Sequence, residues 1–173
     1  MRVITTYLRA AVLTTVTTLF ALPVVAADML DKPEGRVILE VSGKVERTTD
    51  GTVAEFDREG VIALGAETFE TTTPWTEGPV TFTGVPIQAL IDAVGATGET
   101  LTVTALNDYS SQMRIDTVIA AGAILAYDMN GRPLSVREKG PLWVVFPFDS
   151  NEALRTEEYW GYAVWQVKSI DIE

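Results

Sequence analysis

Four residues in the middle of this sequence could bind a ligand through polar or aromatic side chains. Asp108 and Tyr109 follow a stretch of alternating apolar residues, and the guanidinium of Arg114, five residues beyond Tyr109, could meet an anionic ligand. The structural alternative is that Asp108 caps a loop and Tyr109 packs on a sheet. Trp75 stands in a polar stretch, where its indole could stack on a flat ligand, anchor a partner or cover the core.

The segment 146–162, FPFDSNEALRTEEYWGY, combines aromatic side chains with carboxylates. Asp149 and Tyr159 are its candidate ligand-binding residues, together with Arg155, the cation of the segment. Such a surface could hold a cationic ligand or a partner protein. The alternative is a solvated loop whose aromatic side chains cover the edge of a sheet.

The sequence contains no histidine and no cysteine. Serine and cysteine hydrolase mechanisms that depend on an imidazole base are therefore excluded. Ordinary zinc, copper and iron–sulfur sites are excluded as well, because their nitrogen and sulfur ligands are missing. We identify no catalytic residue and expect no metal ligand.

The chain is acidic, with 24 Asp and Glu against 13 Lys and Arg and a net charge of −11. An acidic surface repels phosphate backbones, so binding of nucleic acid is not expected. The sequence shows no basic amphipathic helix, which is the pattern that would indicate a role at a membrane surface.

Residues 1–27 have the pattern of an export signal. Arg2 and Arg9 supply positive charge before the apolar residues 10–26. The small residues Ala26 and Ala27 offer a cleavage point. A retained membrane anchor is the alternative, although several threonines and Pro23 interrupt the apolar run. We expect cleavage, a single mature domain over residues 28–173, and a periplasmic or otherwise exported location with no membrane insertion after cleavage.

Hydrophobic periodicity predicts an α+β domain with a mixed sheet and a few short helices. The clearest helix, 85–98, begins with Pro86 at its first position and carries apolar residues at helical spacing. Asp57 is the expected cap of a second helix, and Asp116 that of a third. We expect helices at 56–64, 85–98 and 116–122, and strands at 36–45, 100–106, 123–129, 142–146 and 164–172. Residues 69–86, 107–116 and 149–159 are expected to be irregular.

Four blocks of the sequence, in this order and spacing, resemble the molybdopterin-binding domain of the sulfite oxidase family. They are FTGVPIQALIDAVGATG, LTVTALNDYSSQM, ILAYDMNGRPLSVREKGPLWVVFP and VWQVKSIDIE. The resemblance covers residues 36–172 and implies the fold of that domain. The matching positions are Phe82, Gly84, Val85, Asp108, Tyr109, Asn130, Gly131, Pro133, Leu134, Gly140, Pro141, Leu142, Pro147 and Trp165.

The sequence departs from this family where the resemblance implies a metal site. In the family's enzymes a cysteine thiolate upstream of the Gly-Val helix binds molybdenum, whereas this chain has FETTTPWTEGPV there. A threonine hydroxyl is a poor substitute for a soft thiolate. Trp143 also stands where many members carry an arginine. We therefore expect no cofactor, with molybdopterin as the alternative.

Our leading hypothesis is an exported, non-catalytic binding or accessory module that recognises a small ligand or a periplasmic or membrane protein partner. A molybdopterin-dependent oxidoreductase with a cysteine-free site is the second hypothesis. A periplasmic sensory input domain for a membrane signalling protein is the third.

Overall fold

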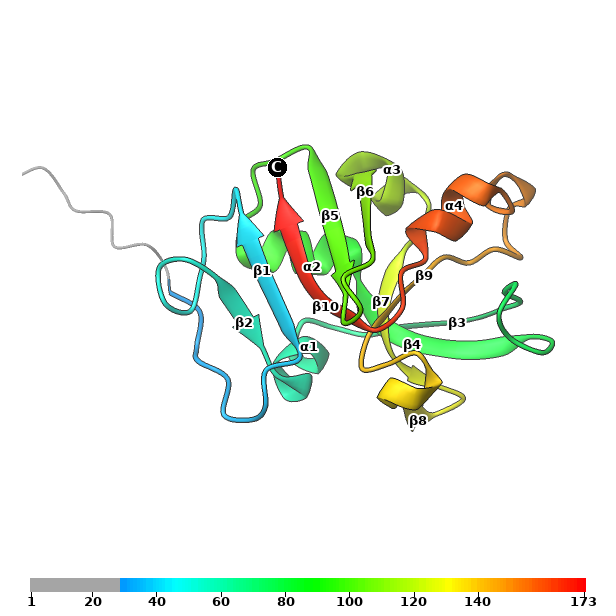
Figure 1. Cartoon of the computed structure of the whole chain (residues 1–173), viewed down its shortest axis with the longest axis horizontal. Helices are drawn as coiled ribbons and strands as arrows, with labels where there is room; N and C mark the ends of the chain where they lie inside the picture. Colours follow the sequence, from blue (N-terminus) through cyan, green and yellow to red (C-terminus); the bar gives the residue numbers. More distant parts are fainter. Residues whose placement is uncertain (1–28) are drawn as a thin grey trace, which may run out of the picture.

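A computed structural model describes residues 29–173, which form one α+β domain (Figure 1). The expected signal peptide at residues 1–27 lies outside the described residues. Within residues 29–173, no helix has both the length and the apolar character needed to cross a bilayer.

The first sheet has five strands in the order β2-β1-β10-β5-β6. The last strand, β10, lies in the centre, where it pairs in parallel with β1 and antiparallel with β5. The sheet is mixed, as predicted. Its strands are β1 (Leu39–Gly43), β2 (Ala54–Phe56), β5 (Thr100–Ala105), β6 (Ser110–Arg114) and β10 (Val167–Ile172).

The second sheet runs β3-β4-β7-β8, and β9 also pairs with β7. Figure 1 shows the β3–β4 hairpin projecting away from the first sheet. At Gly84 the backbone of β7 approaches so closely that a Cβ atom would lie 2.4 Å from the carbonyl oxygen of Leu125. The strands are β3 (Glu67–Thr71), β4 (Val80–Pro86), β7 (Ile124–Met129), β8 (Arg132–Pro133) and β9 (Trp143–Val145).

The first two helices lie where their sequence signals predict them. In α1 (Arg58–Ala63) the Asp57 side chain accepts the N–H of Gly60, as expected of an N-cap. In α2 (Ile87–Val94) the apolar stripe is buried, and Gly95 ends the helix in the left-handed conformation. Pro86 is the N-cap of α2 and the last residue of β4, so it stands one position before the first helical residue.

Two hydrophobic clusters form the core. The larger one joins the first sheet to the helices, and Figure 1 shows α2 behind that sheet. The smaller one lies on the second sheet around Phe82 and Trp143, both with 0% exposure. The smaller cluster also packs against the partly buried Trp75 and Trp165 and so supports these two indoles.

Three expectations about irregular segments are wrong. Residues 69–86 are largely the β3–β4 hairpin, so only the connection between those strands is irregular. Residues 107–116 contain β6, because Asp108 adopts a positive φ of 65° and turns the chain back along β5. Residues 149–159 contain the start of a helix, α4 (Glu157–Tyr162), which Thr156 caps through the N–H of Tyr159.

The expected cap of the third helix is also wrong. The helix α3 (Ile115–Ala120) begins one residue before Asp116, and its N-cap position is Arg114. Asp116 lies in the first turn, where its carboxylate accepts the N–H of Thr117. A negative charge in this turn still favours the helix, because the free N–H groups of the first turn carry partial positive charge.

Candidate functional site

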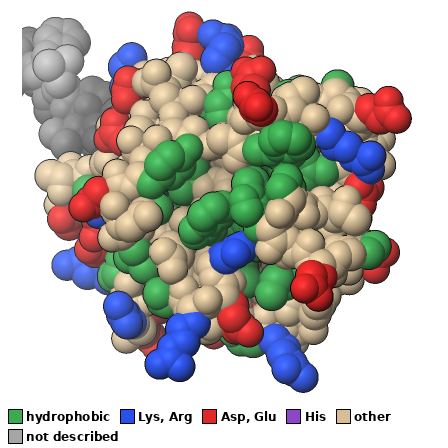
Figure 2. Space-filling model, turned by 45° about the vertical axis from the view of Figure 1, so that its right-hand side comes forward, with side chains coloured by type: hydrophobic (Ala, Val, Ile, Leu, Met, Phe, Trp, Pro, Cys, Tyr) green, Lys and Arg blue, Asp and Glu red, His purple; other side chains and the backbone are tan. Residues whose placement is uncertain are grey.

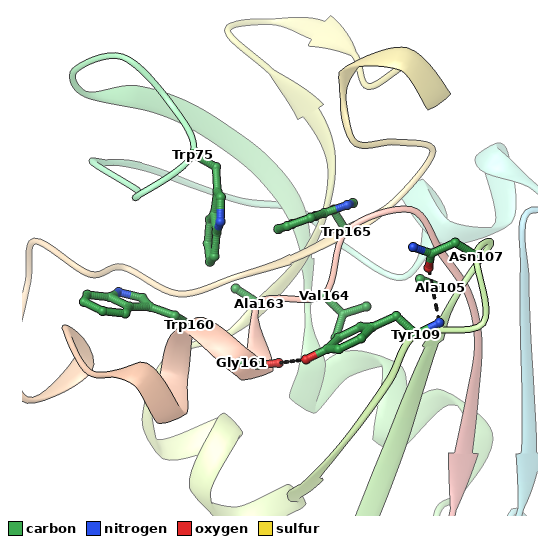
Figure 3. A pocket seen from close by; sticks show the side chains of 9 residues that line it. All are labelled: Trp75, Ala105, Asn107, Tyr109, Trp160, Gly161, Ala163, Val164 and Trp165. Carbon is green, nitrogen blue, oxygen red and sulfur yellow. Dashed lines mark hydrogen bonds between the residues drawn. The ribbon is translucent and has the colours of Figure 1, made fainter.

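A cavity of about 420 Å³ opens beside the connection between β3 and β4. Its walls come from three parts of the chain that are distant in sequence (Figure 3). Aromatic and small apolar side chains dominate, and no carboxylate, lysine or arginine is among the lining residues. They are Trp75, Ala105, Asn107, Tyr109, Trp160, Gly161, Ala163, Val164 and Trp165.

Three of the nine residues that line the cavity are tryptophans. Trp75 comes from the β3–β4 connection, Trp160 from α4, and Trp165 from the segment that leads into β10. The rings of Trp75 and Trp165 meet edge to face, with centroids 5.3 Å apart and an interplanar angle of 69°. Indole walls in this arrangement offer both edges and faces to a flat ligand.

A fourth indole and one cation support this wall from outside the cavity. Trp143 is fully buried, and its ring centroid lies 6.1 Å from that of Trp75 and 6.4 Å from that of Trp165. Its Nε1–H donates to the carbonyl of Ala163, which fixes the ring. The ammonium of Lys139 lies over both Trp143 and Trp165, at 5.7 and 5.3 Å from the ring centroids. These contacts hold Trp165 in place.

The polar groups of the cavity come from the turn between β5 and β6. The Asn107 side-chain oxygen accepts the N–H of Tyr109, and the Tyr109 hydroxyl donates to the carbonyl of Gly161 in α4 (Figure 3). The second bond ties the turn to α4. The amide nitrogen of Asn107 is therefore a donor that the cavity can offer to a ligand.

A carboxylate joins the two segments that carry Trp75 and Trp160. Asp149 accepts the N–H and the hydroxyl of Thr72 at 2.6 and 2.7 Å, and it also pairs with Arg155. The hydrogen bonds from Thr72 lower the pKa of Asp149 below its ordinary value, and Arg155 lowers it further. We call this group of Thr72, Asp149 and Arg155 the clamp.

The structure brings some of the predicted ligand-binding residues together and separates others. Trp75 and Tyr109 both line the cavity. Asp149 and Arg155 form the clamp beside it, and Arg155 lines a smaller adjoining pocket that shares Trp160 with the cavity.

The remaining predicted residues lie outside the cavity lining. Asp108 sits in the same turn as Tyr109 but forms a salt bridge with Lys168, which lowers the pKa of Asp108. Arg114 pairs with Asp116 beside α3, in a different groove. The ring of Tyr159 packs against Phe146 inside the domain.

Two principal walls of the cavity, Trp160 and Trp165, were not among the predicted site residues. Trp160 belongs to the aromatic segment 146–162, for which we predicted no helix over Glu157–Tyr162, so the direction of its side chain could not be predicted. Trp165 was noted for the family resemblance alone. The signal available in the sequence was the total of four tryptophans, all of which lie at the cavity or directly behind it.

The surface around the cavity is apolar. Figure 2 shows hydrophobic side chains gathered across the middle of one face, with charged side chains mostly at its rim. Three of the exposed large hydrophobic residues are close to the cavity or to the groove beside it: Leu106, Tyr109 and Val136.

Comparison with known proteins identifies a family and a related fold. The family model described as "Oxidoreductase molybdopterin binding domain" matches residues 31–149, which is more than half of the chain. The solved structure of the sulfane dehydrogenase SoxCD from Paracoccus pantotrophus is similar, with a TM-score of 0.58 and 18% sequence identity. The similarity covers 78% of this chain but only 37% of that chain, and at this identity it shows the fold alone. No curated protein matches at a significant level.

The family match corrects one expectation. We expected no cofactor because the chain lacks cysteine, but the matching family is described by its molybdopterin binding, which points to binding of the molybdenum cofactor. The aromatic walls of the cavity suit the flat ring of a pterin.

The donor set of the cavity does not fit the metal of that cofactor. Within residues 29–173, no group of three or more His, Cys, Asp or Glu residues could hold a metal ion. The hydroxyls of Thr71 and Thr72 are already hydrogen-bonded to the backbone and side chain of Asp149. Because the chain has no cysteine and no histidine, it supplies no thiolate or imidazole ligand for molybdenum, and we derive no reaction step through the metal.

The fold expected from the sequence is confirmed by the family match and by the structural similarity. The chain belongs to the oxidoreductase molybdopterin binding domain family.

Proposed function

We propose that this chain is a non-catalytic binding module, which holds a flat heteroaromatic ligand of the pterin kind in its aromatic cavity. The observation that carries the proposal is the wall formed by Trp75, Trp160 and Trp165, three indoles around a cavity of about 420 Å³. Cavities of this size with few polar groups are typical of small-molecule sites. An uncharged ring system fits best, because none of the lining side chains carries a charge at neutral pH.

The polar groups at one side of the cavity would orient such a ligand. Asn107 presents an amide donor, and Tyr109 presents a hydroxyl oxygen whose hydrogen is directed to Gly161. The ring nitrogens and carbonyl of a pterin accept hydrogen bonds from the Asn107 amide, and its amino group donates to the Tyr109 hydroxyl oxygen, while its faces lie against the indoles.

Fluorescence with biopterin as the probe tests this function. Tryptophan emission overlaps pterin absorption, so binding should quench the tryptophans and produce pterin emission. We expect the substitution Trp75→Ala to weaken binding about tenfold or more, because it removes a stacking wall. The matched control is Phe69→Ala, an aromatic residue of β3 that does not line the cavity. Equal affinity in wild type and Trp75→Ala, or no binding in wild type, would contradict the proposal.

The family match favours a molybdopterin-dependent oxidoreductase as the second candidate function. Molybdenum content and reductase activity of protein purified from its native host distinguish the two candidate functions. Molybdenum in equimolar amount, together with reductase activity toward small oxo compounds, would establish the second candidate and overturn the non-catalytic assignment.

We further propose that the module works after export, as the pattern of residues 1–27 indicates. Cell fractionation should recover a shortened chain outside the cytoplasm. Recovery of the full-length chain in the cytoplasm would contradict this location.

A further inference from the structure

The helix α4 forms one wall of the aromatic cavity and lies at the edge of the domain in Figure 1. None of its six residues is fully buried. Tyr159, Trp160 and Tyr162 are partly buried against the larger core cluster. Segments with few fully buried side chains open at a lower free energy than the strands of a core. The helix is therefore a cavity wall that can move without disrupting either sheet.

Anchored residues stand on both sides of α4. Leu154, before the helix, is 5% exposed, and Ala163, after it, is 2% exposed. The Nε–H of Arg155 donates to the carbonyl of Phe148, and the Nε1–H of Trp143 donates to the carbonyl of Ala163. Because both ends are held, a movement of α4 is limited to a swing about these two attachments.

The backbone departs from the helical conformation on both sides of α4. Arg155 has φ −89° and ψ 57°, and Ala163 has φ −79° and ψ 60°. At Ala163 this conformation closes a γ-turn, in which the N–H of Val164 donates to the carbonyl of Tyr162. Residues at the ends of elements absorb the dihedral changes when a lid moves. Both ends of α4 therefore have a hinge.

A hydrogen bond joins α4 to the wall that comes from the β5–β6 turn. The Tyr109 hydroxyl donates to the carbonyl of Gly161 at 3.3 Å (Figure 3). This distance is long for a hydroxyl donor, for which about 2.5–3.0 Å is usual. By comparison, the Tyr162 hydroxyl donates at 2.8 Å to Glu158, within α4 itself. The bond between Tyr109 and Gly161 is therefore weak and easily broken.

The turn on the other side of this bond is held firmly. The N–H of Asp108 donates to the carbonyl of Ala105 at 3.0 Å, and the carbonyl of Tyr109 accepts the N–H of Ala105 at 2.8 Å. The carboxylate of Asp108 also pairs with Lys168 in β10, the central strand of the first sheet. Breaking the bond to Gly161 therefore releases α4 and leaves the turn in place.

We propose that α4 is a lid on the aromatic cavity, and that the hydrogen bond between Tyr109 and Gly161 is its latch. Opening the latch moves Trp160 away from the other indoles and admits a flat ligand. The bound ligand contacts Trp160 and holds the lid closed. The inference rests on the proposed function for the identity of the ligand, whereas the motion of α4 belongs to the protein alone.

A distance measurement between two spin labels tests the lid without any ligand. The chain has no native cysteine, so Lys44→Cys and Glu157→Cys place one label beside β1 and the other on α4. Both positions are exposed, and β1 and α4 lie on opposite sides of the domain in Figure 1. Pulsed electron paramagnetic resonance should give one main distance in this parent double variant.

The latch is removed by Tyr109→Phe, which keeps the aromatic ring but cannot donate a hydrogen bond. We expect a second distance between the labels, with a population at least about threefold larger than in the parent, because one hydrogen bond no longer favours the closed state. Tyr109 is 52% exposed, so the variant is expected to fold.

The matched control is Tyr162→Phe. It also removes a tyrosine hydroxyl, but the hydrogen bond of that hydroxyl stays inside α4. Its distance distribution should equal that of the parent.

Stopped-flow fluorescence with biopterin connects the lid to the ligand. We expect Tyr109→Phe to accelerate association about threefold to tenfold, because the open state is more populated. Loss of the contact between the Tyr109 hydroxyl and the ligand would by itself accelerate dissociation alone, so the association rate reports on the lid. Saturating biopterin should also remove the second distance between the spin labels.

Three results would overturn the lid. They are an unchanged distance distribution in Tyr109→Phe, an equal change in Tyr162→Phe, and an unchanged association rate of biopterin in Tyr109→Phe. Absence of biopterin binding to the wild-type protein would contradict the proposed function instead. In that case the distance between the labels still decides whether Tyr109 holds α4 closed.

Discussion

The carboxylate of Asp149 has a close counterpart elsewhere in the molecule. Asp149 binds the N–H and hydroxyl of Thr72 and the guanidinium of Arg155. Asp116 likewise binds the N–H and hydroxyl of a threonine and the guanidinium of an arginine. The two carboxylates differ in the parts of the chain that they connect. Asp149 joins segments that are 77 positions apart, whereas the partners of Asp116 lie within two positions of it.

This pair provides a matched test of the clamp. Asp149→Asn removes the charge that attracts Arg155 and frees the segment that carries Trp75. We expect biopterin affinity to fall about threefold to tenfold, corresponding to about 0.7–1.4 kcal/mol. The fluorine resonance of a 5-fluorotryptophan at position 75 should broaden as the ring becomes mobile.

Asp116→Asn should leave both the affinity and the fluorine resonance unchanged. A sharp, unshifted resonance of Trp75 in Asp149→Asn would show that the clamp does not position this wall. The fluorine resonance tests the clamp even if wild-type protein binds no pterin.

Single residues of the site were predictable only where their neighbours in sequence revealed their environment. Tyr109 follows the predicted strand 100–106 and Trp75 lies in the polar segment 69–86, and both line the cavity. Trp165 lies at the cavity because the chain bridges back to Trp143 before β10 begins. Such long-range pairing leaves no periodic signal in one sequence.

At the level of elements, the contact between β4 and β7 depends on the absence of a side chain at Gly84. A Cβ there would lie 2.4 Å from the carbonyl oxygen of Leu125 and 2.5 Å from the Cα of Ala126. We expect Gly84→Ala to lower the free energy of unfolding by about 1–3 kcal/mol, because the backbone of β7 would have to move. Denaturation in urea measures this change.

Gly161 is the appropriate control because it lies in α4 and a Cβ there would meet nothing within 4 Å. We expect Gly161→Ala to raise the free energy of unfolding by about 0.5–1 kcal/mol, since alanine favours a helix over glycine. Equal effects of the two substitutions would refute the role of close strand approach at Gly84.

Most elements were predicted because their local signals agree with their tertiary positions. The stripe of Ile87, Leu90, Ile91 and Val94 predicts α2, and all four side chains are buried. The strand β6 was missed because it is mainly polar and exposed, with Met113 as its buried residue. Its pairing with β5 comes from a turn at Asp108, a residue type that tolerates positive φ without requiring it.

At the scale of the whole molecule, the absence of histidine predicts an unusual pH profile. No side chain with an ordinary pKa titrates between about pH 6 and pH 8, so the melting temperature should be flat over that range. Several carboxylates have a folded-state pKa below the ordinary 3.8: Asp50, Asp57, Asp108, Asp116 and Asp149.

A lowered pKa means that the folded state favours the ionised carboxylate. The stabilisation from these groups is therefore complete above 3.8 and is lost as the pH falls through their folded-state values. Calorimetry should show a constant melting temperature at neutral pH and a steep fall in acid. A decline between about pH 8 and pH 6 would contradict this assignment of the titrating groups.

The central position of β10 determines when half of the molecule can fold. Its partner β1 is separated from it by more than a hundred residues, and β5 pairs with its other edge. The ribosome releases Val167–Ile172 after every other strand of that sheet. Until then β1 and β5 have no common neighbour, so the first sheet cannot be completed before β10 has been synthesised.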